Sequence, residues 1–244
     1  GFIFNMSKLK NKVIFLTGGT GSFGSAFVPM TLKKLKPKKL IIYSRDESKQ
    51  WDMRNLYSKN KNIEFVIGDV RDYETLKKNM RGVDYVVHAA ATKIVPTAET
   101  NPFECVKTNI NGSMNVINAS LENNVKSVIA LSTDKACNPA NLYGATKLAA
   151  DKLFVSANTF TKEKMTNFSI VRYGNVIGSR GSVIPFFKEK AASGKIPITN
   201  IGMTRFIISL KECVEFVWQS FEQMTGGEIF VKKIPSIKII EIAN

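Results

Sequence analysis

Short apolar runs alternate with longer amphipathic stretches through the first two thirds of the chain. Continuous apolar character is typical of strands that are buried on both faces, whereas the stretches between the runs have the apolar spacing of helices. Six strands are therefore expected, at residues 13–17, 40–44, 63–69, 84–90, 127–133 and 168–174.

Helices are expected between these strands, at residues 22–35, from about 46, from about 73, at 101–123 and at 142–160. Strands that alternate with helices in this way form a parallel sheet with helices on both faces. The predicted fold class is α/β, with a Rossmann-like, doubly wound parallel sheet.

The alternation stops after Gly174, where glycine and proline become frequent. Further elements are expected as a short helix at 184–192, a helix at 210–224, a strand at 228–231 and the opening of a helix at 236. Residues 7–174 would form a Rossmann-like domain to which 206–231 returns. Residues 175–205 and 232–244 would form a small substrate-binding lobe, expected to be incomplete because the last helix has no stop signal.

Composition narrows the classes of function. Three cysteines without a CxxC pair favour a reducing compartment over a disulfide framework. The single histidine, His88, excludes a multi-histidine zinc site and would have to serve any Ser-His-Asp triad. No metal is expected. No apolar run is long enough to cross a bilayer, so we expect a cytoplasmic protein without membrane spans.

The formal net charge of +15 attracts anionic partners of several kinds. Lysine and arginine are spread along the chain, and no nucleic-acid-binding motif accompanies them, so nucleic-acid binding is not expected. Attraction of anionic small molecules and a general preference for lysine are both compatible with this charge.

A glycine cluster, TGGTGSFG, lies between the first expected strand and the first expected helix. Glycine permits positive φ and lets backbone N–H groups approach a pyrophosphate at the helix end. The spacing is GxxGxxG, and ordinary tight turns also use glycine, but the position in the first βα unit favours a dinucleotide. The candidate cofactor-binding residues in this turn are Gly18, Thr20, Gly21, Ser22, Phe23 and Gly24.

The tip of the second strand indicates which dinucleotide binds. NAD-binding proteins usually carry an acidic residue there, but here Ser44 is followed by Arg45. A guanidinium pairs well with a 2′-phosphate, so NADP is favoured. Alternatively, Arg45 is a solvated loop charge and Asp46 caps the next helix. The remaining cofactor contacts are expected from Ser44, Arg45, Asp46, Asp69, Val70, Ala89 and Ala90.

Tyr143 and Lys147 form a YxxxK pair at the start of an expected helix, where the i, i+4 spacing places both on one face. An adjacent ammonium lowers the pKa of a phenol, so Tyr143 is a candidate base for a substrate hydroxyl. Thr133, at the end of the fifth strand, could hydrogen-bond to the same hydroxyl. Such a pair is common by chance, but with the dinucleotide turn upstream it resembles the catalytic residues of short-chain dehydrogenases/reductases. The resemblance implies that Thr133, Tyr143 and Lys147 are catalytic and that Tyr143 and Lys147 also contact the cofactor.

Longer segments extend this resemblance. TGGTGSFG, YSRDE, GDVRD, HAAATK, LSTDKACNPANLYGATK, VRYGNVIGSRGSVIPFF and MTRF are similar to segments of the soluble inverting UDP-N-acetylglucosamine 4,6-dehydratases. The resemblance implies NADP as cofactor, UDP-N-acetylglucosamine as substrate, and the first step of pseudaminic acid synthesis. It also implies that Tyr143 removes the proton of the sugar 4-hydroxyl, Lys135 removes the C5 proton and Asp134 assists departure of the 6-hydroxyl.

The same resemblance implies the substrate contacts and the assembly. Substrate contacts are expected from Lys93, Asn175, Arg180 and Arg205. Each has a plainer interpretation, as a loop lysine, a turn residue or a surface charge. Relatives of this kind form homo-oligomers.

Asn109, inside an expected helix, is interpreted as structural support. Thr92, Ile94 and Thr100 replace the leucine, histidine and tyrosine expected in close relatives, on the loop that faces the sugar.

Three other functions were weighed against this one. The retaining or membrane-anchored dehydratases generally have methionine at the position of Tyr143 and carry membrane spans. A nucleotide-sugar epimerase or reductase would need no Asp134–Lys135 pair. A non-catalytic NADP-binding module would need none of the residues Thr133, Asp134, Lys135, Tyr143 and Lys147.

Overall fold

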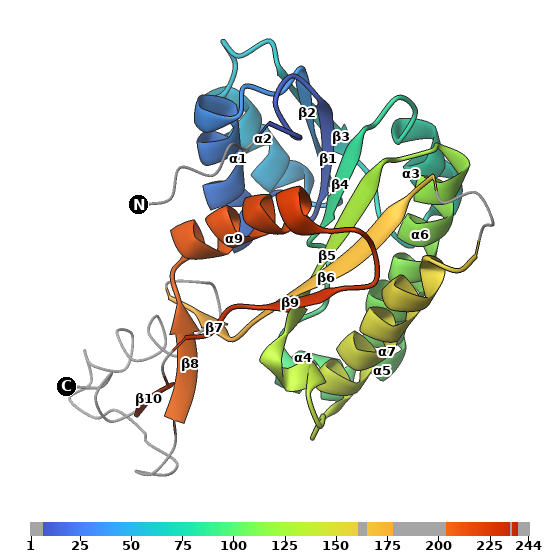
Figure 1. Ribbon diagram of the computed structural model, residues 1–244, viewed down its shortest axis with the longest axis vertical. Coiled ribbons are helices and arrows are strands. Elements are labelled where there is room, and N and C mark those ends of the chain that lie inside the picture. The colour runs from blue at the N-terminus through green and yellow to red at the C-terminus, as the bar shows by residue number, and fades with distance from the viewer. Residues whose placement is uncertain (1–6, 161–164, 178–203, 235, 239–244) are drawn as a thin grey trace.

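A computed structural model of the protein describes residues 7–160, 165–177, 204–234 and 236–238. Within them, seven parallel strands form one sheet in the order β3-β2-β1-β4-β5-β6-β9 (Figure 1). The strands are β1 (Val13–Thr17), β2 (Lys39–Ser44), β3 (Ile63–Ile67), β4 (Tyr85–His88), β5 (Ser127–Thr133), β6 (Asn167–Tyr173) and β9 (Ile229–Val231). The order reverses between β1 and β4, which is the doubly wound arrangement predicted from the alternating pattern.

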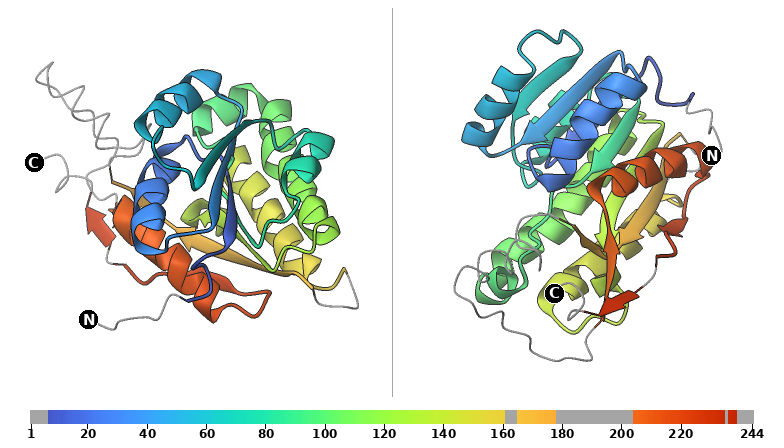
Figure 2. Two further views of the ribbon diagram at one scale, coloured as in Figure 1. Left: turned by 90° about the horizontal axis from the view of Figure 1, so that it is seen from above. Right: turned by 90° about the vertical axis from the view of Figure 1, so that its left-hand side faces the viewer.

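Helices cover both faces of this sheet (Figure 2). One face carries α1 (Ser22–Lys34) and α9 (Leu210–Gln223), with α2 (Glu47–Leu56) beside them; the other carries α3 (Tyr73–Asn79), α6 (Gly112–Glu122) and α7 (Leu142–Ala157). Two hydrophobic clusters, one on each face, fill the space between sheet and helices. The apolar runs therefore become strands buried on both faces, as their composition predicted.

A π-helical turn (Lys107–Asn111) joins α5 (Pro102–Val106) to α6, so the helix expected at 101–123 is interrupted. The segment expected to be a loop before it contains a short helix, α4 (Val95–Thr100). Pro96 stands in the first turn of α4, where the missing N–H of proline costs nothing. These short helices lead from the end of β4 back toward α7.

The segment after β6 departs from the sequence-based prediction. The prediction that a helix opens at Ser236 is wrong, because Ser236–Lys238 is a strand, β10. This strand pairs antiparallel with β8 (Thr204–Ile208). β8 also pairs with β7 (Asn175–Val176), so these three strands form a small second sheet. A short apolar segment fits the hydrophobic period of a helix and that of a strand. Here the backbone of β8 supplies the hydrogen-bonding partner that favours the strand. The helix expected at 184–192 lies outside the described residues.

The described residues contain no helix that is both long enough and apolar enough to cross a membrane.

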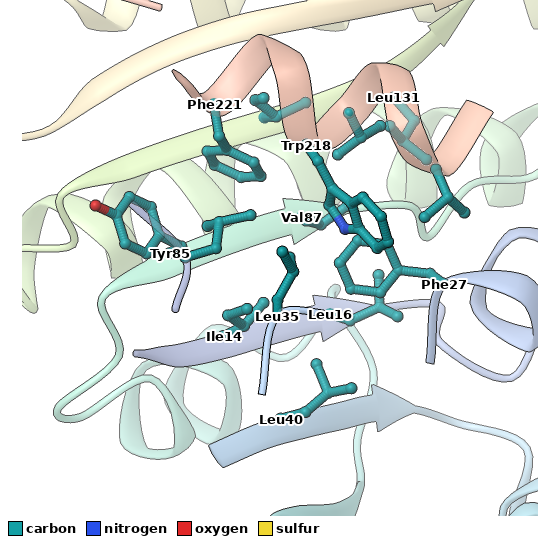
Figure 3. Packing of buried hydrophobic residues seen from close by; sticks show 14 of the residues in the cluster. Ile14, Leu16, Phe27, Leu35, Leu40, Tyr85, Val87, Leu131, Trp218 and Phe221 are labelled. Atoms are coloured by element: carbon teal, nitrogen blue, oxygen red, sulfur yellow. The ribbon is translucent and has the colours of Figure 1, made fainter. Parts of the chain in front are cut away.

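Trp218 anchors α9 to the sheet and to α1 (Figure 3). Its side chain is fully buried, beside Phe27 and Phe221 in the same cluster, and its indole Nε1–H donates to Thr31 Oγ1 at 3.2 Å. Buried tryptophan contributes a large apolar area, and the hydrogen bond satisfies its one polar atom.

We predict that Trp218→Ala lowers the free energy of unfolding by about 3–5 kcal/mol, because it removes an aromatic ring from a closed core. Urea denaturation followed by circular dichroism would measure the loss. The other tryptophan of the chain, Trp51, is 64% exposed, so Trp51→Ala is the matched control, with an expected change within about 0.5 kcal/mol. Equal losses in the two variants would contradict the assignment of Trp218 to the core.

Candidate active site

A cavity of about 610 Å³ lies at the carboxyl ends of the parallel strands. The crevice beyond these ends, where the strand order reverses, is where doubly wound sheets bind their ligands. Eighteen of the residues singled out in the sequence line the cavity: Gly18, Thr20, Gly21, Ser22, Phe23, Ser44, Arg45, Asp46, Asp69, Val70, Ala89, Ala90, Lys93, Thr133, Lys135, Tyr143, Lys147 and Asn175. Residues far apart in the chain thus meet at one place.

The glycine turn connects β1 to α1 and fits a dinucleotide pyrophosphate. Gly18 has φ +65°, and a Cβ there would come within 2.7 Å of the backbone nitrogen of Ala90. Gly24 lies against the backbone of Gly19, so only glycine lets α1 start this close to the strand. No side chain caps the N-terminus of α1 at Gly21. The glycine turn can therefore present its backbone N–H groups to a phosphate.

The tip of β2 combines a hydroxyl with a cation. Ser44 Oγ accepts hydrogen bonds from Thr20 Oγ1 at 3.3 Å and from Gln50 Nε2 at 3.0 Å. The Arg45 side chain is 65% exposed at the cavity edge, and its Nη1 lies 3.9 Å from Asp69 Oδ2. Asp46 caps α2 by accepting from the backbone N–H of Lys49 at 2.9 Å, so the capping interpretation of Asp46 is confirmed.

Asp69 lies at the end of β3, where adenine contact was expected. Its Oδ2 accepts from Arg71 Nη2 at 2.8 Å. Partial burial favours the neutral acid, but the hydrogen bonds and charge of Arg71, with the charge of Arg45, lower the pKa of Asp69 below its usual value. The carboxylate therefore stays ionised at neutral pH and acts as an acceptor.

The catalytic candidates come from β5 and α7. Thr133 ends β5, and a 3₁₀ turn (Asp134–Ala136) follows it directly. Asn141 caps α7 by accepting from the backbone N–H of Gly144 at 2.9 Å, which starts the helix just ahead of Tyr143. Within the turn, Thr133 Oγ1 donates to Asp134 Oδ1 at 3.1 Å.

The pKa of Tyr143 differs from the sequence-based expectation. Burial raises it to about 12, a hydrogen bond with the Thr133 hydroxyl acts in the opposite direction, and the charges of Asp134 and Asp151 add to the rise. Lys147 does not lower it here, since its Nζ donates to the carbonyl oxygen of Leu131 at 2.7 Å. Burial also lowers the pKa of Lys147, opposed by the charge of Asp151. Desolvation outweighs the expected effect of the ammonium.

Lys135 lies between two oxygen acceptors. Its Nζ is 3.4 Å from Asp134 Oδ1 and 3.2 Å from Asn175 Oδ1. The Nδ2 atom of Asn175 is buried and has no hydrogen-bond partner among the described residues. An unpaired buried amide is costly, so this donor suits an oxygen of a bound ligand.

The remaining candidate substrate contacts differ in whether they line the cavity. Lys93 lines the cavity beside Ile94, which is 53% exposed. Arg205 lies on β8 and is absent from the cavity wall; its Nη1 donates to the carbonyl oxygen of Thr204 at 2.9 Å. Arg180 lies outside the described residues. Asp134 and Gly24 are also absent from the cavity wall, although both neighbour residues that form it.

Asn109 supports the loop that carries Lys93. Its Oδ1 accepts from the backbone N–H of Thr92 at 2.8 Å, and its Nδ2 donates to the carbonyl oxygen of Thr92 at 3.0 Å and to Thr146 Oγ1 at 3.1 Å. The structural interpretation of Asn109 is therefore confirmed. It joins the loop after β4 to α7 through side-chain hydrogen bonds.

His88 is a core residue. Burial lowers its pKa to about 3, with a further contribution from the charge of Lys147, so the ring is neutral at physiological pH. Its Nδ1 lies 2.7 Å from Thr17 Oγ1, and its ring packs against Phe154. Its Nε2 lies 3.5 Å from Ser113 Oγ, so the two ring nitrogens face hydroxyl groups, and the described residues form no Ser-His-Asp triad around it.

Two features of the site were missed in the sequence. Tyr173, at the end of β6, lines the cavity, and burial raises its pKa well above the usual range, so it remains a neutral phenol. Asp151 and Arg172 form an ion pair of 2.8 Å behind Tyr143 and Lys147. An acidic residue one turn beyond Lys147 on the same helical face was the available signal for Asp151, but its partner on β6 is not apparent from spacing.

Comparisons with known proteins agree with this geometry. Residues 14–244 match the family described as "Polysaccharide biosynthesis protein". The chain is 60% identical over 235 residues to a UDP-N-acetylglucosamine 4,6-dehydratase (inverting) from Campylobacter jejuni, covering 96% of this chain and 70% of that protein. It is 46% identical over 238 residues to a UDP-glucose 4-epimerase from Rickettsia akari, with the same coverage of both chains.

Among solved structures, Pen from Bacillus thuringiensis superposes with a TM-score of 0.92 at 40% sequence identity, covering 96% of this chain and 75% of that one. Similarity at this level extends over the sheet, the cavity and the elements that bring the candidate residues together. The chain therefore belongs to the family of polysaccharide biosynthesis proteins, alongside the inverting UDP-N-acetylglucosamine 4,6-dehydratases.

Proposed function

We propose that this protein is an NADP-dependent UDP-N-acetylglucosamine 4,6-dehydratase that inverts C5, and that it supplies the first intermediate of pseudaminic acid synthesis. The observation that carries the proposal is the meeting of Tyr143 and Lys147 with the Asp134–Lys135 turn at the edge of a dinucleotide cavity. The 60% identity to an enzyme of that name supports it. We also propose that the protein forms a homo-oligomer, as the resemblance of its sequence implies.

Oxidation at C4 of the sugar needs a base for the 4-hydroxyl. Tyr143 takes this proton, with Thr133 hydrogen-bonding to the same oxygen. A phenol with a pKa near 12 is a poor base at neutral pH, so a cation must come closer to it than in the ligand-free arrangement. Lys147 is one turn away and becomes that cation when its Nζ leaves the carbonyl oxygen of Leu131 for the bound ligands. The chemistry that a bound nicotinamide supplies is reversible uptake of one hydride from the sugar.

Elimination of water needs a second base and an acid. Once C4 is a ketone, the proton on C5 is acidic, and Lys135 removes it. Asp134 gives a proton to the departing 6-hydroxyl, which leaves as water and produces an unsaturated ketone. Return of the hydride to C6 and of a proton to C5, on the face opposite to the original hydrogen, completes a redox-neutral conversion. Transfer of one proton from Lys135 Nζ to Asp134, whose Oδ1 lies 3.4 Å away, gives the neutral amine and the carboxylic acid that these two roles require.

The other contacts in the cavity are consistent with a nucleotide sugar. Asn175 presents its unpaired Nδ2 to a substrate oxygen while its Oδ1 holds Lys135. Lys93 offers positive charge from the loop after β4. Arg180 and Arg205 are retained as proposed diphosphate contacts, and for Arg205 this requires a change from its present contact with Thr204.

The reaction itself provides the decisive measurement. The protein would be incubated with UDP-N-acetylglucosamine and catalytic NADP⁺ in D₂O and followed by proton NMR. A new C6 methyl signal, with deuterium at C5 and couplings of the L-arabino sugar, is expected. A change of configuration at C4 without a C6 methyl would indicate an epimerase instead, the activity named for the Rickettsia akari relative.

We predict that Tyr143→Phe lowers kcat by about 10²–10⁴, because it removes the acid–base group while keeping the ring that fills the site. Initial rates of methyl-signal formation would measure the loss. Tyr85→Phe is the matched control, since Tyr85 is buried in the core away from the cavity, and its rate should be unchanged. A Tyr143→Phe variant with the wild-type rate would exclude Tyr143 as the base.

We predict that Arg45→Leu weakens NADP⁺ binding by roughly 10- to 100-fold, because hydrogen bonds to a charged group contribute about 1.5–3 kcal/mol. NAD⁺, which lacks the 2′-phosphate, should bind the variant and the wild type equally. Isothermal titration calorimetry of the wild type and the variant with each dinucleotide measures the four dissociation constants. Equal losses for both dinucleotides would contradict a 2′-phosphate contact at Arg45.

A further inference from the structure

Asp151 is a buried carboxylate that lies directly behind the catalytic residues. Its side chain is 2% exposed, and one oxygen, Oδ2, accepts two hydrogen bonds and makes an ion pair. Ser132 Oγ donates at 2.9 Å and Arg172 Nε at 2.8 Å, and Arg172 Nη2 lies 2.8 Å from the same oxygen. A buried charge held by this many donors has a single orientation, and its location between β5, β6 and α7 connects three elements.

β5 and α7 are joined at three consecutive strand residues. Tyr143, Lys147 and Asp151 recur every fourth residue and so form one stripe on α7. Lys147 donates to the carbonyl oxygen of Leu131 and Asp151 accepts from Ser132, while Tyr143 lies next to Thr133, whose hydroxyl acts on its pKa. Asp151 therefore completes the same row of contacts that holds the two catalytic residues of α7.

Arg172 extends this row to the catalytic turn. It pairs in register with Ser132 on the neighbouring strand, and its Nη1 donates to Cys137 Sγ at 3.2 Å. Cys137 directly follows the Asp134–Ala136 turn. One guanidinium thus holds α7 through Asp151 and the end of the Asp134–Lys135 turn through Cys137.

We propose that Asp151 and Arg172 are positioning residues of the catalytic site: their ion pair holds the Asp134–Lys135 turn in register with Tyr143 and Lys147. This inference rests on the proposed function for its catalytic consequences. Tyr143 and Lys147, which act in the oxidation, lie on α7, whereas Asp134 and Lys135, which act in the elimination, lie on the turn after β5. Both pairs must reach one sugar ring. α7 also packs directly against the turn, and the Asp151–Arg172 pair adds a link that involves neither pair directly.

The charge of Asp151 also reaches the catalytic groups. Lys147 faces Asp151 and Tyr143 on its own helix and His88 from β4. Tyr143 faces Asp134 from the turn, Cys105 from α5 and Tyr173 from β6, as well as Asp151. The negative charge of Asp151 raises the pKa of both Lys147 and Tyr143, so its removal lowers both.

The first test is Asp151→Asn, which keeps the shape of the side chain and removes its charge. We predict that kcat falls by roughly tenfold or more with little change in KM, because the reacting groups are displaced rather than the binding surface. Both limbs of the pH profile of kcat should move to lower pH. A loss of stability alone lowers kcat at every pH without shifting its pH dependence. An unshifted pH dependence in an active variant would therefore overturn the electrostatic part of the inference.

Glu228→Gln is the matched control. Glu228 is also a partly buried carboxylate held by a serine, Ser169 of β6, but it lies at the opposite end of that strand from the cavity. Its neutralisation should lower the melting temperature while leaving the pH profile unchanged. The same shift in both variants would show that the effect comes from general destabilisation.

Cys137 tests the geometric part separately, because its side chain is exposed and can be replaced without opening a cavity in the core. Cys137→Ala removes the acceptor of Arg172 Nη1 and should lower kcat without moving the pH profile. Cys137→Ser restores an acceptor and should recover most of the rate. Wild-type kcat in Cys137→Ala would show that Arg172 does not hold the turn.

A readout without substrate distinguishes failure of this inference from failure of the proposed function. The titration of Lys147 is followed by NMR of ¹³Cε-labelled lysine, with its signal assigned by Lys147→Arg. The midpoint should be lower in Asp151→Asn than in the wild type, and equal midpoints would overturn the inference. Absence of product from the wild type would contradict the proposed function, while the titration still decides the role of Asp151.

Discussion

Parallel pairing of β1, β4, β5 and β6 places the carboxyl ends of these strands at one edge of the sheet, and every part of the candidate site depends on that placement. The glycine turn follows β1, the loop of Lys93 follows β4, the Asp134–Lys135 turn follows β5, and Asn175 follows β6. Two hydrophobic clusters, one on each face of the sheet, hold the strands in register. Residues from these four segments therefore reach one cavity, together with residues at the ends of β2 and β3 and at the start of α7.

Burial gives this cavity its electrostatic character. Tyr143, Lys147 and His88 are all shifted toward their neutral forms, because desolvation is the largest contribution to each pKa. A buried phenol with a raised pKa is a weak base, so proton transfer to Tyr143 from a hydroxyl requires a cation close to its oxygen. Lys147, on the same face of α7, is the cation that the proposed function assigns to this role.

The site is assembled from two pairs of residues with different supports. Tyr143 and Lys147 lie on α7, which packs against β5 and β6, whereas Asp134 and Lys135 lie on a short turn that itself packs against α7. The turn and the helix must keep this relation if both are to act on the same sugar. The partly buried guanidinium of Arg172, which contacts Asp151 on α7 and Cys137 after the turn, has the location and the donors for that purpose.

The sequence by itself determined the features that are local: the strands and helices of the main sheet, the glycine turn, and the residues at the strand ends. Each depends on hydrophobic period or on a motif within a few residues. Tertiary structure alone decided the strand at Ser236, the absence of Arg205 from the cavity wall, the pairing of Asp151 with Arg172, and the direction of the pKa shift of Tyr143. All four depend on partners distant in the chain or on burial, and neither is encoded in local spacing.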